Sequence, residues 1–382
     1  MPSNKNQHYV PIFHLTHFSN DGKSIKLFNL KSEKTISGAS LRDQCSKDYL
    51  YGKDLTIEKA LGQLEGRIAE IIKETSMLEN LPSRYSREHE NLVYYVLTLY
   101  GRTLHMADAY NEIIDNLAKY MITPALKSRG LEEADLDGIK VKSKKPAAIA
   151  LSYITLNYHL LLDLDFKLLK NCTDEQFIIS DNPVVLYNQL FNFKLFGSNS
   201  GLACKGLQIF CPISPNHMLI FFDEAVYKVS TRKKVVVEIT NINDIRQLNA
   251  LQLVSANKNV YFKDMPETLR QQHIKCGKYY RKNKASIKSF LNFEEADRKN
   301  EYICIYREDV RTNLDVSVIR FLKKAKEWRN NFLKLPYRPA VVVRDEYLVL
   351  KHQEYIELVK SGKVEINGFF RWLKSQNANE FL

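Results

Sequence analysis

The sequence lacks any segment that would carry the chain into or across a membrane. No run of about 18 apolar residues occurs in the 382-residue chain. The first residues, Met1 to Asn6, lack the apolar core and small-residue cleavage site of a signal peptide. The sequence therefore predicts a cytoplasmic protein with no membrane partner.

The motifs of the common cofactor-binding proteins are also missing. The six cysteines lie far apart, with no Cys-x-x-Cys pair and no Cys/His spacing of a zinc module. We expect free thiols in a reducing compartment. No phosphate-binding loop, dinucleotide fingerprint or His-Glu-x-x-His motif occurs, which argues against nucleotide hydrolases and common dehydrogenases.

Positive charge, in contrast, is plentiful. The formal net charge is +12, and much of the excess lies in clusters at residues 140–145, 232–234, 275–284 and 323–329. A basic surface attracts polyanions over long distances, so RNA or DNA is the expected partner. A solvated surface that only confers solubility is the alternative, because charge alone carries no specificity.

Hydrophobic periodicity in the first half predicts an extended segment followed by helices. Residues 8–30 read as strand or extended segments, at His8 to Val10 and at Ser24 to Leu30, where the second run alternates; a turn is expected at Asn20 to Lys23. Thr56 is the expected N-cap of the first long helix. The helices are expected at residues 57–76, 86–106, 107–128 and 147–171, with a lysine-rich linker at 130–146.

After residue 172 the pattern changes to short strands. We expect strands at residues 177–179, 208–210, 217–222, 233–239, 260–262 and 340–343, and helices at 241–257 and 314–335. The prediction is an α+β fold with an N-terminal extended segment or hairpin, a central helical block and a later mixed or antiparallel sheet.

The same pattern suggests two parts of the chain. Residues 1–270 would form one α+β domain, with its helical block at 56–171 and its strand-rich part at 172–265. Residues 271–382 would form a basic C-terminal extension, helical with a short strand, which binds a partner or packs on the body of the protein.

Several short motifs occur in a fixed order along residues 5–265. They are His8 to Pro11 followed by Phe13, Leu15 and Phe18, a helix with paired glutamates, Gly101 to Thr103, and Ser180 to Pro183. In this order they resemble domain-of-unknown-function family 4238, whose members are chiefly bacterial and uncharacterised. The resemblance implies a shared fold and a shared site, and it supplies no reaction.

Three residues of the first half are candidates for that site. His8 has a side chain suited to general acid or base chemistry or to metal binding, or it anchors the N-terminus through a carbonyl. Glu65 lies at the border of an apolar helix stripe, where a carboxylate could bind a metal, orient His8 or pair with Arg102. Arg102 needs an anionic partner, which would be Glu65, Asp181 or the phosphate of a ligand.

Asp181 and Asn182 end an apolar strand and begin a turn. Polar residues there are suited to catalysis on a rigid scaffold, and they are equally suited to holding a turn through backbone hydrogen bonds. Ser214 follows a similar strand, but the sequence shows neither a neighbouring base nor a nucleophile elbow, so we expect it to be structural.

Together these features predict a hydrolase acting on nucleic acid, such as a nuclease-like toxin or an antiviral (phage-defence) effector. His8 would be the acid or base, Arg102 would hold phosphate, and Asn182 would complete the catalytic set. Glu65 and Asp181 would bind a divalent cofactor, Mg²⁺ or Mn²⁺, or position water. The alternative is a non-catalytic nucleic-acid-binding or protein-interaction module, which could also form a homo-oligomer.

Overall fold

The computed structural model describes residues 5–130, 136, 138–192, 199–277, 285–291, 301–307, 312–335, 341–366 and 368–376. Parts of three predicted features therefore lie outside the described residues. These are the linker at 130–146, the basic cluster at 275–284 and the strand at 340–343.

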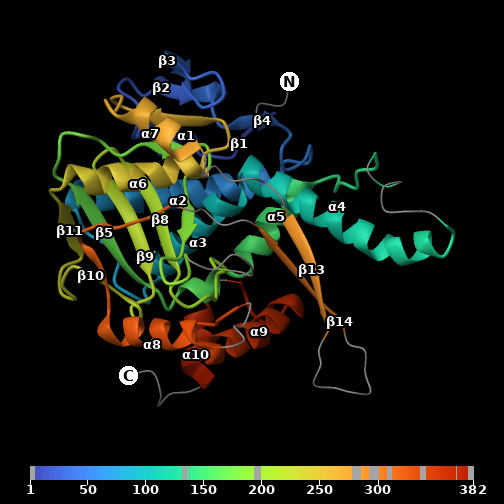
Figure 1. The fold of residues 1–382 in the computed structure, drawn as a ribbon. Coiled ribbons are helices and arrows are strands. Elements are labelled where there is room, and N and C mark those ends of the chain that lie inside the picture. The colour runs from blue at the N-terminus through green and yellow to red at the C-terminus, as the bar shows by residue number, and fades with distance from the viewer. Residues whose placement is uncertain are drawn as a thin grey trace.

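The elements follow one another as Figure 1 shows. The first are β1 (Asn6–His8), α1 (Ile12–Thr16), β2 (Ser24–Asn29), β3 (Lys34–Ser40), β4 (Ser46–Asp48), α2 (Thr56–Leu78), α3 (Arg87–Gly101), α4 (Leu104–Lys127) and α5 (Pro146–Thr155). Next come β5 (Asp165–Asn171), β6 (Ile179–Ser180), β7 (Val185–Tyr187), β8 (Gln208–Ser214), β9 (His217–Phe222), β10 (Tyr227–Val229), β11 (Val236–Ile239), α6 (Ile242–Ser255) and β12 (Asn259–Phe262). The last are α7 (Leu269–Cys276), β13 (Ala285–Leu291), β14 (Glu301–Arg307), β15 (Ile319–Phe321), α8 (Lys323–Leu333), α9 (Glu346–Lys360) and α10 (Phe369–Gln376).

A mixed sheet with helices on both faces forms the centre of the molecule (Figure 1). Its strand order is β11-β5-β9-β8-β7, antiparallel except for the parallel pair β11 and β5. Leu168 and Leu169 on β5 point to opposite faces, so Leu168 packs with residues of α2 and α3 and Leu169 packs with residues of α6. A strand covered on both faces reads as a continuous apolar run, as in β9.

A second sheet carries the N-terminal hairpin, in the order β3-β2-β12-β6. The predicted turn before β2 is confirmed: Asp21 Oδ1 accepts from the backbone nitrogens of Lys23 at 2.8 Å and Ser24 at 2.7 Å, and Gly22 has φ +67°. β1 pairs with β4 in a separate two-stranded ribbon. The N-terminal segment is therefore fixed at the edge of the helical block, and the α+β class is confirmed.

Several predicted helix boundaries are wrong. The helix expected at 147–171 ends at Thr155, and a 3₁₀ turn (Tyr158–Leu161) and β5 follow. The apolar run continues past the end of the helix because the 3₁₀ turn and β5 are both buried. Hydrophobic periodicity cannot distinguish a buried helix from a buried turn and strand. The helix expected to run through Met106 ends at Gly101, because Thr103 caps α4 by accepting from Met106 N at 3.3 Å.

Two further boundary predictions need correction. Leu55, in a left-handed conformation, occupies the N-cap of α2 in place of Thr56. The helix expected over 314–335 begins only at Lys323, because Ile319–Phe321 forms β15 and pairs with β10. Apolar and basic residues alternate in that segment, which suits a strand with one buried face.

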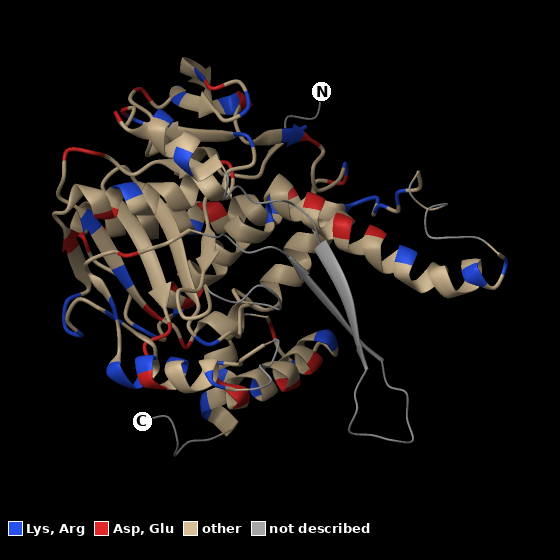
Figure 2. Ribbon diagram, in the orientation of Figure 1, with Lys and Arg blue, Asp and Glu red and all other residues tan. Residues whose placement is uncertain are grey.

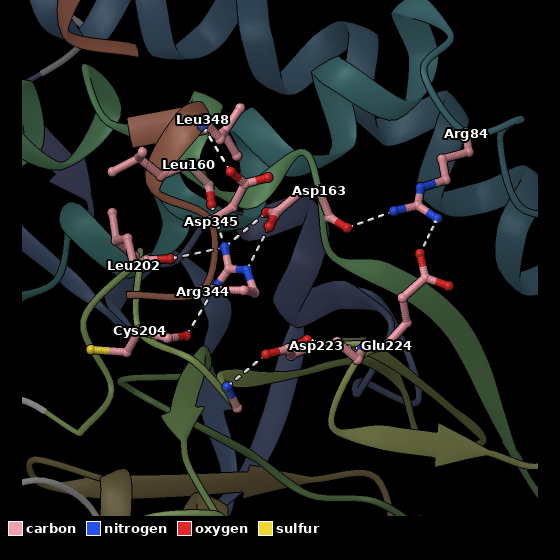
Figure 3. A network of polar contacts seen from close by, with 12 residues as sticks. Arg84, Leu160, Asp163, Leu202, Cys204, Asp223, Glu224, Arg344, Asp345 and Leu348 are labelled. Carbon is pink, nitrogen blue, oxygen red and sulfur yellow. Dashed lines mark hydrogen bonds and ion pairs between the residues drawn. The ribbon is translucent and has the colours of Figure 1, made fainter. Parts of the chain in front are cut away.

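The C-terminal extension packs on the body of the protein. Arg344 binds both carboxylate oxygens of Asp163, at 2.5 and 2.8 Å, and donates to the carbonyl oxygens of Cys204 at 2.9 Å and Leu160 at 2.6 Å (Figure 3). Leu348 and Phe369 of the extension join the same core cluster as α3. Because a buried guanidinium needs such partners, Arg344 fixes the extension in one position.

The described helices include none that is both long and apolar enough to cross a membrane.

Candidate functional site

Arg102 lies at the C-terminal end of α3 and is almost fully buried. Its Nη1 donates to Glu65 Oε1 at 2.5 Å, and its Nη2 donates to the backbone carbonyl of His8. The nearby Tyr51 and Glu65 raise the pKa of Arg102 against the lowering effect of burial. The guanidinium therefore stays charged, and its charge is neutralised within the protein.

Tyr51 closes the same cluster from the loop before α2. Its hydroxyl donates to the carbonyl of Arg102 at 3.0 Å, and Arg102 Nε donates to that hydroxyl at 3.4 Å. Its backbone nitrogen donates to Gln7 Oε1 at 2.7 Å, and Gln7 Nε2 donates to Gly52 O at 3.1 Å. Gln7, His8, Tyr51, Glu65 and Arg102 thus form one closed polar cluster, called here the N-terminal tie.

The ring of His8 is bound by the backbone of Arg42. Its Nε2 lies 3.0 Å from the carbonyl oxygen of Arg42, and since a carbonyl only accepts, Nε2 carries the proton and Nδ1 is left as an acceptor. Burial lowers the pKa of His8, so the ring is neutral at pH 7. The backbone of His8, not its imidazole, joins the N-terminal tie.

Asp181 is a buried turn residue. Its carboxylate accepts from the backbone nitrogens of Asn257, Lys258 and Asn259 at 2.7, 2.8 and 3.2 Å. Burial raises the pKa of Asp181 to about 6, with these bonds opposing the shift. The carboxylate therefore holds the loop between α6 and β12, as the turn interpretation of Ser180 to Pro183 expected.

Asn182 makes further hydrogen bonds in the same region. Its Nδ2 donates to Ser255 Oγ at 3.0 Å, and Ser255 Oγ donates to the carbonyl of Asn182 at 2.8 Å. The five predicted site residues thus fall into two groups: His8, Glu65 and Arg102 meet in the N-terminal tie, while Asp181 and Asn182 hold the end of α6. Within the described residues, no group of three or more His, Cys, Asp or Glu side chains could hold a metal ion.

The structure corrects the expectation for Ser214, since a base does lie beside it. Ser214 Oγ is 3.1 Å from His217 Nδ1, and His217 Nε2 is 3.6 Å from Glu79 Oε1. Asn216 N also donates to Ser214 Oγ at 3.3 Å, which is the geometry of a hydroxyl holding a turn. These contacts close the β8–β9 turn and attach the end of α2, so the structural assignment of Ser214 stands.

A different polar region lies open on the surface, where β10 pairs with β15. Lys228 and Arg320 are directly opposite each other in the register and both are exposed, while Tyr227, Val229 and Ile319 are buried. Further exposed bases come from the β10–β11 loop and the first turn of α8, and Figure 2 shows the basic residues gathered there. We call these residues the basic ribbon: Lys228, Arg232, Lys233, Lys234, Arg320, Lys323 and Lys324.

Lys167 on β5 binds the β10–β11 loop, which carries part of the basic ribbon. Its Nζ donates to the carbonyl oxygens of Thr231 at 3.0 Å, Arg232 at 3.2 Å and Lys234 at 2.5 Å. All three donors of the ammonium group are thus directed at one loop. The loop is held in a defined shape with its basic side chains exposed.

The sequence arguments missed Tyr51 and, within the basic ribbon, Lys228 and Arg320. The clusters at residues 232–234 and 323–329 contain the other five ribbon residues. No local signal marks Tyr51, whose partners are distant in the chain. The ribbon did leave a signal in the apolar–basic–apolar pattern of residues 227–229 and 319–321, because this alternation marks strands with one exposed basic position.

Comparison with known proteins places the chain in one family. The model of the family described as "Protein of unknown function (DUF4238)" matches residues 6–265, and the chain belongs to that family. No curated protein and no solved structure matches the chain. The family match covers the N-terminal tie, Asp181 and Asn182, and the β10 half of the basic ribbon.

Proposed function

We propose that the protein binds nucleic acid through the basic ribbon, without catalysis by the N-terminal tie. The observation that carries this proposal is the exposed cross-strand pair of Lys228 and Arg320. Like charges directly opposite each other destabilise a β-ribbon. A phosphate backbone laid along this ribbon would neutralise both charges and release its own counterions.

The surroundings of the pair support a polyanion as partner. Glu224, one of the carboxylates beside the ribbon, binds Arg84 at 2.6 Å and reaches Arg232 at 3.4 Å. The side chain of Arg232 is still 90% exposed. The acid beside the ribbon is thus engaged by two arginines, and the exposed bases around it carry a surplus of positive charge that steers an anion to the surface.

The geometry of the N-terminal tie favours binding over catalysis. Glu65 and Arg102 neutralise each other, and Arg102 also binds the backbone of His8. A phosphate would have to displace these contacts before it could use Arg102. The proposal therefore assigns the tie to the attachment of the N-terminal segment.

A nucleic-acid hydrolase is the second candidate, and the observation in its favour is the ring of His8. A neutral imidazole with Nδ1 free to accept a proton is suited to act as a general base. In this scheme Mg²⁺ or Mn²⁺ would assist, with Glu65 or Asp181 as a ligand, and a toxin or antiviral role would follow from cleavage.

Fluorescence anisotropy with labelled single-stranded and duplex oligonucleotides, over a series of salt concentrations, tests the binding proposal. Lys228→Gln combined with Arg320→Gln should weaken binding and reduce the salt slope for a single strand by about 0.7 for each lost phosphate contact. Lys142→Gln combined with Lys144→Gln removes two exposed charges elsewhere and serves as the matched control. Equal effects of the two double variants would refute a site at the ribbon.

The same oligonucleotides test the second candidate. Incubation with Mg²⁺ or Mn²⁺ should leave them intact if the protein only binds them. Cleavage by the wild type that disappears in His8→Ala would establish the hydrolase instead.

A further inference from the structure

A pocket of about 390 Å³ opens beside the basic ribbon. Its apolar lining includes Phe222 and Leu322, and its charged lining includes Asp165, Glu224, Lys228 and Arg232. The volume falls in the range of roughly 300–1,000 Å³ in which proteins take one small organic molecule. A base pair within a duplex could not enter it, because the paired strand would have to enter too.

The lining combines three kinds of group that one nucleotide would satisfy. Apolar side chains can contact the face of a base, and a carboxylate can accept from the amino group at its edge. Lys228 and Arg232 stand where they can contact a phosphate, and Lys228 belongs to both the pocket and the cross-strand pair. A strand lying along the ribbon would therefore pass the mouth of the pocket.

We propose that this pocket takes one unpaired nucleotide of a single-stranded nucleic acid, so that the ribbon prefers single strands to duplexes. This inference rests on the proposed function of the basic ribbon. It adds the class of nucleic acid and a defined position for one base.

The walls of the pocket are held in place before any ligand arrives. Glu224 is fixed by Arg84, whose Nη2 also donates to the carbonyl of Asp163 at 2.5 Å (Figure 3). On the other side, Lys167 holds the loop that contains Thr231 and Arg232. Such preorganisation lowers the entropy lost when a ligand is ordered in the pocket.

The test is to fill the pocket without changing its charge. Thr231 lines the pocket and is exposed, and a Thr231→Trp substitution keeps the backbone carbonyl that Lys167 binds. We expect about ten-fold weaker binding of a labelled single-stranded oligonucleotide, which is the scale of one lost base contact. Binding of the duplex of the same sequence should be unchanged, and Thr231→Val should behave as the wild type.

The outcomes separate this inference from the proposed function. If Thr231→Trp lowers single-strand and duplex binding equally, or lowers neither, the pocket does not hold a base, while the ribbon is still supported. If the wild type binds neither oligonucleotide, the proposed function and this inference both fail.

Discussion

The N-terminal tie and the basic ribbon use the same kinds of side chain in opposite ways. In the tie, Arg102 is buried and meets a carboxylate, a hydroxyl and a carbonyl of its own chain. In the ribbon, Lys228 and Arg320 are exposed and lie opposite each other with like charge. The tie satisfies its own charges, whereas the ribbon leaves its charges exposed to solvent.

This contrast indicates how function can be recognised in a family without an assigned reaction. Motif residues such as Arg102 and Asp181 have internal partners, so we expect their substitution to change stability. A surface with unbalanced charge gains stability only when a partner binds. Substitutions in the tie should therefore change unfolding, and substitutions in the ribbon should change binding.

The largest effect is expected from breaking the tie at its centre. Arg102→Met leaves Glu65 unpaired and removes the guanidinium donor from the His8 carbonyl, so the free energy of unfolding should fall by about 3–5 kcal/mol. Urea denaturation measures this loss, and Arg42→Met is the control because Arg42 is exposed. A loss no larger than that of the control would show that the cluster does not hold the N-terminal segment.

Acid should destabilise the protein through buried histidines. His14 is bonded to Tyr95 Oη at 2.7 Å and to the Pro212 carbonyl at 2.8 Å, and burial lowers its pKa to about 4. The unfolded chain binds this proton near pH 6.5 and the folded chain does not, so stability is lost as pH falls from 6.5 towards 4.

The expected slope from His14 alone is about 1.4 kcal/mol per pH unit within that window. His14→Gln should reduce the pH dependence of the unfolding free energy, measured by urea denaturation, by this amount. An identical pH profile for the variant and the wild type would exclude the contribution of His14. Asp181 opposes the trend, because its raised pKa adds stability as pH falls through about 6.

Removing the Asp181 carboxylate tests its role as a turn residue. Asp181→Ala leaves the backbone N–H groups of Asn257, Lys258 and Asn259 without their carboxylate acceptor, so the free energy of unfolding should fall by about 2 kcal/mol. Nucleic-acid binding of the folded variant should be unchanged. Lost binding at wild-type stability would return Asp181 to the functional site.

A small effect is expected at His8. His8→Ala keeps the backbone carbonyl that Arg102 binds and removes one side-chain hydrogen bond to Arg42, which is worth about 1 kcal/mol. The unfolding free energy measures this change. A loss as large as that of Arg102→Met would mean that the ring, and not the backbone, anchors the segment.

The sequence allowed the α+β class, the family and the need of Arg102 for an anion to be predicted. Those inferences depend on local periodicity, on short motifs and on the physics of one buried charge. The choice of Glu65 over Asp181 as its partner could not be predicted, because it depends on where α2 and β6 lie in space. The end of α5 at Thr155 could not be predicted either, because one apolar run covers a helix, a turn and a strand.

The basic ribbon was harder to predict than the N-terminal tie, for a related reason. Lys228 and Arg320 are neighbours only because β10 and β15 pair across a long stretch of chain. Charge clusters in the sequence indicated a polyanion but did not show which bases share a surface. The register of one short strand pair supplied that information.

One variant tests the central claim on both stability and binding. Arg320→Thr keeps a good strand former and removes the like-charge pair, so the free protein should gain about 0.5 kcal/mol in unfolding free energy. The same variant should bind a single-stranded oligonucleotide more weakly and with a shallower salt dependence. Unchanged affinity and an unchanged salt slope in Arg320→Thr would contradict the assignment of the basic ribbon as the binding surface.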